Sequence, residues 1–269
     1  MVENDHKSAI STFFSAKSIF ITGGTGFIGK QIIEKLLRSC SALDRIYVLV
    51  RPKHGIHVHQ RIEQLCSLPA IRLLIPNFKT KIIPVLGDIT KNEFDLSNED
   101  QQLLIENCQI VINSGASVRF TEPLKQAIKS NLYSVRNMIN LCKKMQQLQS
   151  FVHISTAYIH PYRLDIDEVL YPMNEDPNLL LESIEGFSEK MFDYLSKKLL
   201  INYPNTYTYT KSLAEYLILQ QANQLPIGEE LSQLNLNIFF SSFFFKLAII
   251  RPSIVGATWN EPIPESFTN

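Results

Sequence analysis

The sequence predicts an α/β fold in which a parallel sheet is doubly wound and carries helices on both faces. Short apolar runs rich in Ile, Val and Phe alternate along the chain with segments whose apolar residues recur at helical spacing. These runs are nearly continuous in apolar residues, as expected for strands that are covered on both sides. With 269 residues, of which 45% are hydrophobic, the chain can bury a sizeable core.

The individual elements follow from the same pattern. Strands are predicted over residues 19–21, 46–50, 81–86, 110–112, 151–154 and 247–250. Helices are predicted over residues 29–38, around 103–106, and over 131–145 and 206–221. The segment 161–205 mixes acidic and apolar residues and is predicted to be an insertion that forms a small partial lobe before the last of these helices.

Composition argues against several classes of protein. Lys and Arg together number 26, as do Asp and Glu, so the net charge is zero and nothing indicates a nucleic-acid partner. The four cysteines form no C-x-x-C pair, which indicates a reduced, intracellular protein. No signal peptide is expected at the N-terminus, and no transmembrane segment is expected, because no apolar run reaches about 18 residues. His54, His57 and His59 lie in one loop without a carboxylate or cysteine at ligand spacing, so no metal site is predicted.

A glycine-rich loop joins the first strand to the first helix. It consists of Gly23, Gly24, Thr25, Gly26, Phe27, Ile28 and Gly29. Gly23 permits a tight turn, Gly26 lets a pyrophosphate approach the backbone, and Gly29 lets the helix pack closely on the strand. The free N–H groups and positive dipole of the helix N-terminus attract phosphate. The loop therefore predicts a dinucleotide site in a Rossmann-type sheet.

The residues after the next two strands refine the expected cofactor. Sites for NAD usually place Asp or Glu after the second strand to bind the ribose 2′-hydroxyl, and here the position is occupied by Arg51, with Lys53 nearby. A cation suits the 2′-phosphate of NADP, so an NADP-type cofactor is predicted. Asp88 follows the third strand and either bonds the adenine edge or caps the next turn.

Tyr207 and Lys211 are the predicted catalytic pair. They lie four residues apart, so a helix places them on one face, one turn from each other. A nearby ammonium is expected to lower the pKa of the phenol, which then gives a proton to a carbonyl oxygen as hydride arrives. Ser155 and Thr156 end the fifth predicted strand, where the ligand crevice of a parallel sheet opens. The order of these motifs predicts a reductase active site.

The chain resembles the fatty acyl-CoA reductases of the extended short-chain dehydrogenase/reductase superfamily. Two stretches are especially specific to that family, PNTYTYTKSLAE at 204–215 and IIRPSIVGATWNEPIP at 249–264. The resemblance implies NADPH-dependent reduction of a long-chain fatty acyl-CoA to a primary alcohol through an aldehyde. It also implies a peroxisomal or endoplasmic-reticulum membrane location, through a C-terminal region beyond this chain.

The resemblance also implies roles for individual residues. Tyr207 would be the proton donor, Lys211 its activator, and Thr156 the group that polarises the carbonyl, with Ser155 as the alternative. The cofactor-binding set would comprise the residues of the glycine loop together with Arg51, Asp88, Ser114, Gly115 and Ala116. Asn131 would brace the site from the following helix.

Two departures from the family lead to further expectations. Residues 1–269 would form a single reductase domain with a partial substrate lobe, without the C-terminal helical domain of the family. Residues 227–246 would be an insertion, and because its run of Phe and Ser can be encoded by pyrimidines alone, a translated intron end is one hypothesis, which transcript sequencing would test. The alternatives are another extended reductase, acting on a sterol or a nucleotide sugar, and an NADPH-binding remnant without activity.

Overall fold

The sheet has the predicted parallel, doubly wound arrangement. We analysed a computed structural model of the chain, which describes residues 8–53, 55–72, 78–226, 247–257 and 261–262. All strand pairs are parallel, and the order is β3-β2-β1-β4-β5-β6. The strands are β1 (Ile19–Thr22), β2 (Ile46–Val50), β3 (Ile82–Leu86), β4 (Ile110–Asn113), β5 (Ser150–Ile154) and β6 (Leu247–Ile250). The winding direction reverses between β1 and β4, which is where such sheets bind ligands.

Two apolar clusters, one on each face, hold the sheet between its helices. Successive strand residues alternate between them: Phe20 belongs to one cluster, and its neighbours Ile19 and Ile21 belong to the other. The first cluster includes residues of α5 (Asn98–Asn107), α7 (Ser134–Lys144) and α10 (Thr206–Gln221). The second includes residues of α2 (Phe27–Ser39) and α3 (Val58–Cys66). Both faces are therefore buried, which explains why the strands read as apolar runs.

Several helices differ from the predicted ones. The helix predicted from residue 131 begins earlier, because α6 (Leu124–Ile128) runs into a π-helical segment, η3 (Lys129–Tyr133), and then into α7. The helix over α3 was not predicted. The remaining short helices are α1 (Ala9–Phe14), α4 (Pro69–Arg72), η1 (Phe78–Lys81), η2 (Asn92–Asp95) and η4 (Ala222–Gln224).

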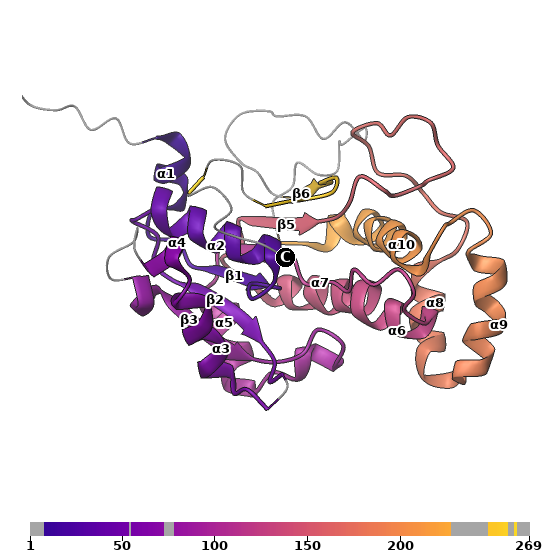
Figure 1. The fold of residues 1–269 in the computed structure, drawn as a ribbon, viewed down its shortest axis with the longest axis horizontal. Coiled ribbons are helices and arrows are strands. Elements are labelled where there is room, and N and C mark those ends of the chain that lie inside the picture. The colour runs from indigo at the N-terminus through magenta and orange to yellow at the C-terminus, as the bar shows by residue number, and fades with distance from the viewer. Residues whose placement is uncertain (1–7, 54, 73–77, 227–246, 258–260, 263–269) are drawn as a thin grey trace, which may run out of the picture.

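The predicted insertion at 161–205 contains two helices that the sequence analysis did not locate. They are α8 (Pro177–Gly186) and α9 (Glu189–Leu199), with Asp176 and Ser188 as their N-caps. In Figure 1 both lie at the edge of the molecule, α8 beside α10 and α9 beside α6. The predicted insertion at 227–246 lies outside the described residues. Within the described part of the chain, none of the helices has the length and hydropathy that a bilayer span requires.

Candidate active site

A cavity of about 870 Å³ lies at the carboxyl ends of the strands. Its walls come from the segments that follow all six strands, together with Arg61 on α3 and Tyr207 on α10. Of the predicted site residues, all except Gly24 and Lys211 line it. A smaller hollow of about 380 Å³ adjoins it and shares Arg119, Glu122 and Gln126 with it.

The glycine loop has the shape that a phosphate-binding turn requires. Gly23 has a φ of +70°, and a Cβ there would lie 2.7 Å from the carbonyl oxygen of Ser114. A Cβ at Gly29 would collide with the backbone of Gly23 and Gly24. Gly26 caps α2, whose N-terminus has no side-chain cap and no acidic residue in its first turn. The N–H groups there are therefore available to an anion in the cavity.

Gly24 contributes to packing and does not line the cavity. A Cβ at this position would lie 2.6 Å from Cγ1 of Val48, so the absence of a side chain lets the loop sit against β2. Gly24, which was predicted to bind the cofactor, thus supports the shape of the loop and does not itself face the cavity.

Three cationic side chains lie at one end of the cavity, from Arg51, Lys53 and Arg61. The Arg61 guanidinium donates to the Thr25 hydroxyl at 2.8 Å and to the carbonyl of Arg51 at 2.6 Å. Arg61 was not among the predicted site residues, because the helix α3 was not predicted. The signal available in the sequence was a basic residue, Arg61, on the helix that directly follows the second strand.

Asp88 serves as a turn cap in this structure, which is one of the two roles predicted for it. Its Oδ1 accepts hydrogen bonds from the backbone N–H and the hydroxyl of Thr90, both at 2.9 Å, and its Oδ2 lies 3.2 Å from Nη1 of Arg51. Burial raises the pKa of Asp88, but the hydrogen bonds from Thr90 and Arg51 outweigh it, so the pKa is lowered. Asp88 also lines the cavity, so contact with a ligand remains a prediction.

Tyr207 and Thr156 come together on the cavity wall. Tyr207 lies in the first turn of α10, which Asn205 caps by accepting from the N–H of Thr208 at 2.9 Å. The Tyr207 ring packs against Phe120, with 5.7 Å between centroids, and its hydroxyl is hydrogen-bonded to Thr156. The neighbouring hydroxyl of Ser155 is buried without a partner and also belongs to a residue that lines the cavity.

Lys211 does not act on Tyr207 as the sequence analysis expected. Burial raises the pKa of Tyr207, and the hydrogen bond with Thr156 lowers it only in part, so the predicted lowering is wrong for this arrangement. The Lys211 amine instead donates to the carbonyl of Ile154 at 2.6 Å and lies 3.3 Å from Nε2 of His153. Burial lowers the pKa of Lys211 to about 8, against an opposing effect of Glu215.

Asn131 holds the loop after β4 against α10. Its Oδ1 accepts from the N–H of Ser117 at 2.8 Å, and its Nδ2 donates to the carbonyl of Ser117 and to the hydroxyl of Thr210. The π-helical segment η3 carries this side chain toward the cavity loop, and π-helical segments are frequent at functional sites.

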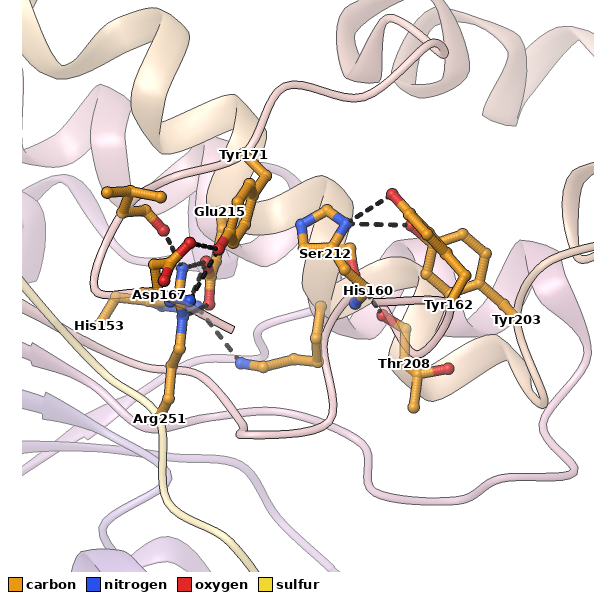
Figure 2. A network of polar contacts seen from close by, with 12 residues as sticks. His153, His160, Tyr162, Asp167, Tyr171, Tyr203, Thr208, Ser212, Glu215 and Arg251 are labelled. Atoms are coloured by element: carbon orange, nitrogen blue, oxygen red, sulfur yellow. Dashed lines mark hydrogen bonds and ion pairs between the residues drawn. The ribbon is translucent and has the colours of Figure 1, made fainter. Parts of the chain in front are cut away.

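Glu215 on α10 forms an ion pair with Arg251, in which the carboxylate is buried and the guanidinium partly buried. Oε2 of Glu215 lies 2.6 Å from Nη2 of Arg251, and the guanidinium also donates to the carbonyls of Asp167 and Val169. Figure 2 shows these side chains gathered beside His153. Among the described residues, no cluster of His, Cys, Asp or Glu side chains could hold a metal ion, and His54 lies outside that part of the chain.

Comparisons with solved structures agree with the fold. The terminal R domain of the myxalamid PKS-NRPS biosynthetic pathway matches 90% of this chain and half of its own chain, with a TM-score of 0.61 and 21% identity. The reductase-containing di-domain of an archaeal non-ribosomal peptide synthetase matches 93% of this chain and 44% of its own, with a TM-score of 0.56 and 21% identity. At this identity the likeness shows the fold alone.

Sequence comparisons show the family. Fatty acyl-CoA reductase 1 of Gallus gallus is 40% identical over 97% of this chain and 47% of its own length. Fatty acyl-CoA reductase 2 of Homo sapiens is 39% identical over 96% of this chain and 47% of its own length. The chain thus spans about half the length of the curated relatives it matches. An NAD-binding family profile described as "Male sterility protein" matches residues 21–269, from β1 through the last described residues, so the chain belongs to the male sterility protein family and holds a nicotinamide-dinucleotide site.

Proposed function

We propose that this chain is the cofactor-binding and catalytic part of an NADPH-dependent fatty acyl-CoA reductase, which converts a long-chain fatty acyl-CoA to a primary alcohol through an aldehyde. One observation carries the proposal: the hydrogen-bonded hydroxyls of Tyr207 and Thr156 lie on the wall of the same cavity as the glycine loop. The two reductases named above, at 39% and 40% identity, support the choice of substrate.

The residues of the cavity fit a phosphorylated nicotinamide dinucleotide. The uncapped N-terminus of α2 and the glycine loop suit the pyrophosphate, and Ser114, Gly115 and Ala116 line the cavity beside them. Arg51 and Arg61 would hold the 2′-phosphate, with Lys53 adding positive charge. The buried, unpartnered hydroxyl of Ser155 offers a further polar contact to a bound group. Each reduced nicotinamide would supply one hydride when bound, so the two reductions would consume two NADPH molecules in succession.

Tyr207 would supply the proton. Its raised pKa keeps the hydroxyl protonated at neutral pH, which a proton donor to the substrate oxygen requires. Thr156 would donate a second hydrogen bond to that oxygen as negative charge develops on it. The same pair would serve twice, first as the thioester is reduced and loses CoA to leave the aldehyde, and then as the aldehyde becomes the alcohol.

Two further parts of the proposal rest on the organisation of the chain and on its family resemblance. The described elements surround one sheet, which supports a single reductase domain over residues 1–269, with α8 and α9 as a partial substrate lobe. A location at the peroxisomal or endoplasmic-reticulum membrane is proposed from the resemblance to the fatty acyl-CoA reductases.

The test is an assay of NADPH oxidation by the purified chain with palmitoyl-CoA, with products identified by gas chromatography and the Gallus gallus reductase as positive control. We expect hexadecanol with NADPH and much less with NADH. Oxidation with a sterol ketone or a nucleotide-sugar ketone alone would replace the proposal with another reductase. Binding of NADPH without turnover of any of these substrates would reject it in favour of an inactive cofactor-binding protein.

A further inference from the structure

A carboxylate oxygen lies without a hydrogen-bond donor where the cavity meets the smaller hollow. Glu122 lines both the cavity and the hollow of about 380 Å³. Its Oε2 is buried, and no donor among the described residues forms a hydrogen bond with it. Burying a carboxylate oxygen without a hydrogen bond costs free energy, so such an oxygen needs a partner. The donor must therefore come from a bound molecule or from water.

The hollow lies beside the residues of the proposed reaction. The backbone carbonyl of Glu122 accepts a hydrogen bond from the Thr206 hydroxyl at 2.9 Å, and Thr206 directly precedes Tyr207 at the start of α10. Phe120, two residues before Glu122, packs against the Tyr207 ring. Glu122 and Tyr207 also line the same cavity. A substrate that has its reacting carbonyl at Tyr207 and continues into the hollow would therefore pass Glu122.

The lining of the hollow is polar and carries a small negative charge. The residues that line it are Arg119, Thr121, Glu122, Pro123, Gln126 and Glu189. The exposed apolar side chains of the same loop, from Val118 and Phe120, do not belong to this lining. One arginine (+1) and two glutamates (−2) give the lining a formal charge of −1. The hollow thus suits an uncharged polar group better than a fatty chain or a phosphate.

The part of an acyl-CoA that matches this lining is the pantetheine arm. The arm is uncharged, and each of its amides offers an N–H and a carbonyl. Arg119 and Gln126 can donate to such carbonyls, and Oε2 of Glu122 can accept from an N–H. The arm is bonded directly to the thioester sulfur, so it must lie next to the carbonyl that Tyr207 and Thr156 would bind. The diphosphate of CoA is at the far end of the arm.

We propose that the hollow holds the pantetheine arm of the acyl-CoA, and that Oε2 of Glu122 accepts a hydrogen bond from an amide N–H of that arm. Glu189 is the first residue of α9, so one wall of this subsite comes from the lobe that α8 and α9 form. The identity of the substrate rests on the proposed function. The contact acts in the first reduction alone, since CoA leaves with its arm before the aldehyde is reduced.

Two substrates separate this role from a role in cofactor binding or in the fold. Palmitoyl-CoA carries the arm, whereas hexadecanal lacks it and uses the same cofactor and the same Tyr207. Glu122→Ala should raise KM for palmitoyl-CoA by about 10-fold or more and change KM for hexadecanal by less than about 2-fold, because it removes a hydrogen bond to a charged group. Glu122→Gln keeps an oxygen that can accept the same N–H, so its KM for palmitoyl-CoA should be intermediate. An unchanged KM for palmitoyl-CoA, or an equal loss with both substrates, would overturn the proposal.

The control is Glu106→Ala. It removes a carboxylate from an exposed position on α5 that lines neither the cavity nor the hollow, and it should leave KM for both substrates unchanged. Glu122→Gln should also keep the Tm of the wild type, because Oε2 of Glu122 has no hydrogen-bond partner among the described residues. A Tm lowered by more than about 5 °C would mean that the carboxylate has a partner within the protein, contrary to the proposal.

A binding measurement decides the question without turnover. S-hexadecyl-CoA has a thioether in place of the thioester, so it cannot be reduced. In calorimetric titrations with NADP⁺ present, Kd for this compound should be about 10-fold or more higher in Glu122→Ala than in the wild type. An equal Kd would mean that water alone is the partner of Glu122, and no binding to the wild type would equally overturn the proposal. If the reductase assay fails but this difference in Kd is found, the proposed reaction is rejected and the subsite stands.

Discussion

Tyr207 and Thr156 show how burial can suit a residue to its task without a neighbouring charge. The phenol is held by Phe120 on one side and by the Thr156 hydroxyl on the other, and its pKa is raised by desolvation. The donor form is therefore the stable one, and the proton leaves only when an acceptor gains negative charge next to it. In the proposed reaction, the proton would therefore stay on the Tyr207 hydroxyl between turnovers.

We expect Tyr207→Phe to lower kcat of acyl-CoA reduction by about 100-fold or more, because it removes the proton donor but keeps the ring against Phe120. Thr156→Val should lower kcat by about 10-fold or more through the lost hydrogen bond to the oxyanion. Ser155→Ala is the matched control, since its hydroxyl has no hydrogen-bond partner among the described residues, and it should have the smaller effect. If Ser155→Ala lowers kcat more than Thr156→Val does, Thr156 is not the residue that stabilises the oxyanion.

The buried Lys211 amine should make stability depend on pH. Its pKa is lowered to about 8 in the folded chain, so the unfolded chain binds more protons between that value and the ordinary pKa of 10.5. The free energy of unfolding of the wild type, relative to Lys211→Met, should therefore rise by up to about 3 kcal/mol between pH 7.5 and pH 10.5. Urea unfolding of both chains across this range measures the difference, and a fall with increasing pH would be inconsistent with an uncharged amine.

At the scale of elements, α10 is fixed by polar contacts from two residues that lie one turn apart on the same face of the helix. Lys211 joins it to β5, and Glu215 joins it through Arg251 to the segment after β6 and to the loop containing Asp167 and Val169. The helix that carries Tyr207 is thus tied to the two strands that end nearest to it. The position of Tyr207 on the cavity wall therefore depends on Lys211, Glu215 and Arg251, none of which lines the cavity.

We expect Arg251→Gln to destabilise the chain by about 3 kcal/mol, because it leaves the buried Glu215 carboxylate without its partner. Lys35→Gln, which removes one partner of an exposed pair with Glu261, is the control and should cost less than about 1 kcal/mol. Chemical denaturation of the two variants compares them directly. Equal losses would mean that the Glu215 pair contributes no more than a surface contact.

At the scale of the whole molecule, the cavity assembles residues that are far apart in the sequence. The reversal of strand order between β1 and β4 opens a crevice, and the segments that follow all six strands line it. Arg51 follows β2 and Arg61 lies on the next helix, yet the two side chains line the same end of it. The proposed preference for NADPH therefore depends on how β2 and α3 come together in the assembled sheet.

Arg61→Gln should weaken NADPH binding by about 10-fold or more while changing NADH binding by less than about 3-fold, because only NADPH carries the 2′-phosphate. Titration of the nicotinamide fluorescence gives both dissociation constants. Lys30→Gln, which removes the same charge from a residue of α2 that does not line the cavity, serves as the control and should affect neither. Equal weakening of both cofactors would place Arg61 at the pyrophosphate or in the fold.

Much of the fold could be predicted because the relevant signals are local. The apolar runs and the glycine spacing depend on residues that are neighbours in sequence, and the structure confirms the six strands and the loop that follows β1. The helices α3, α8 and α9 were missed although local signals were present: α3 has Val58, Ile62 and Leu65 at helical spacing, and Asp176 and Ser188 cap α8 and α9. Residues 227–246 remain an expectation outside the described residues.

The sequence by itself determined the fold class, the turn of the glycine loop and the spacing of Tyr207 and Lys211 on one helix. The tertiary structure decided which hydroxyl meets Tyr207, where Lys211 points and which arginine joins Arg51. The physical reason is that spacing along a helix sets which side chains share a face, whereas a pKa depends on burial and on partners from other elements. His153 is the clearest case, because only the pairing of β1, β4 and β5 places it in line with Thr22, Asn113 and Lys211.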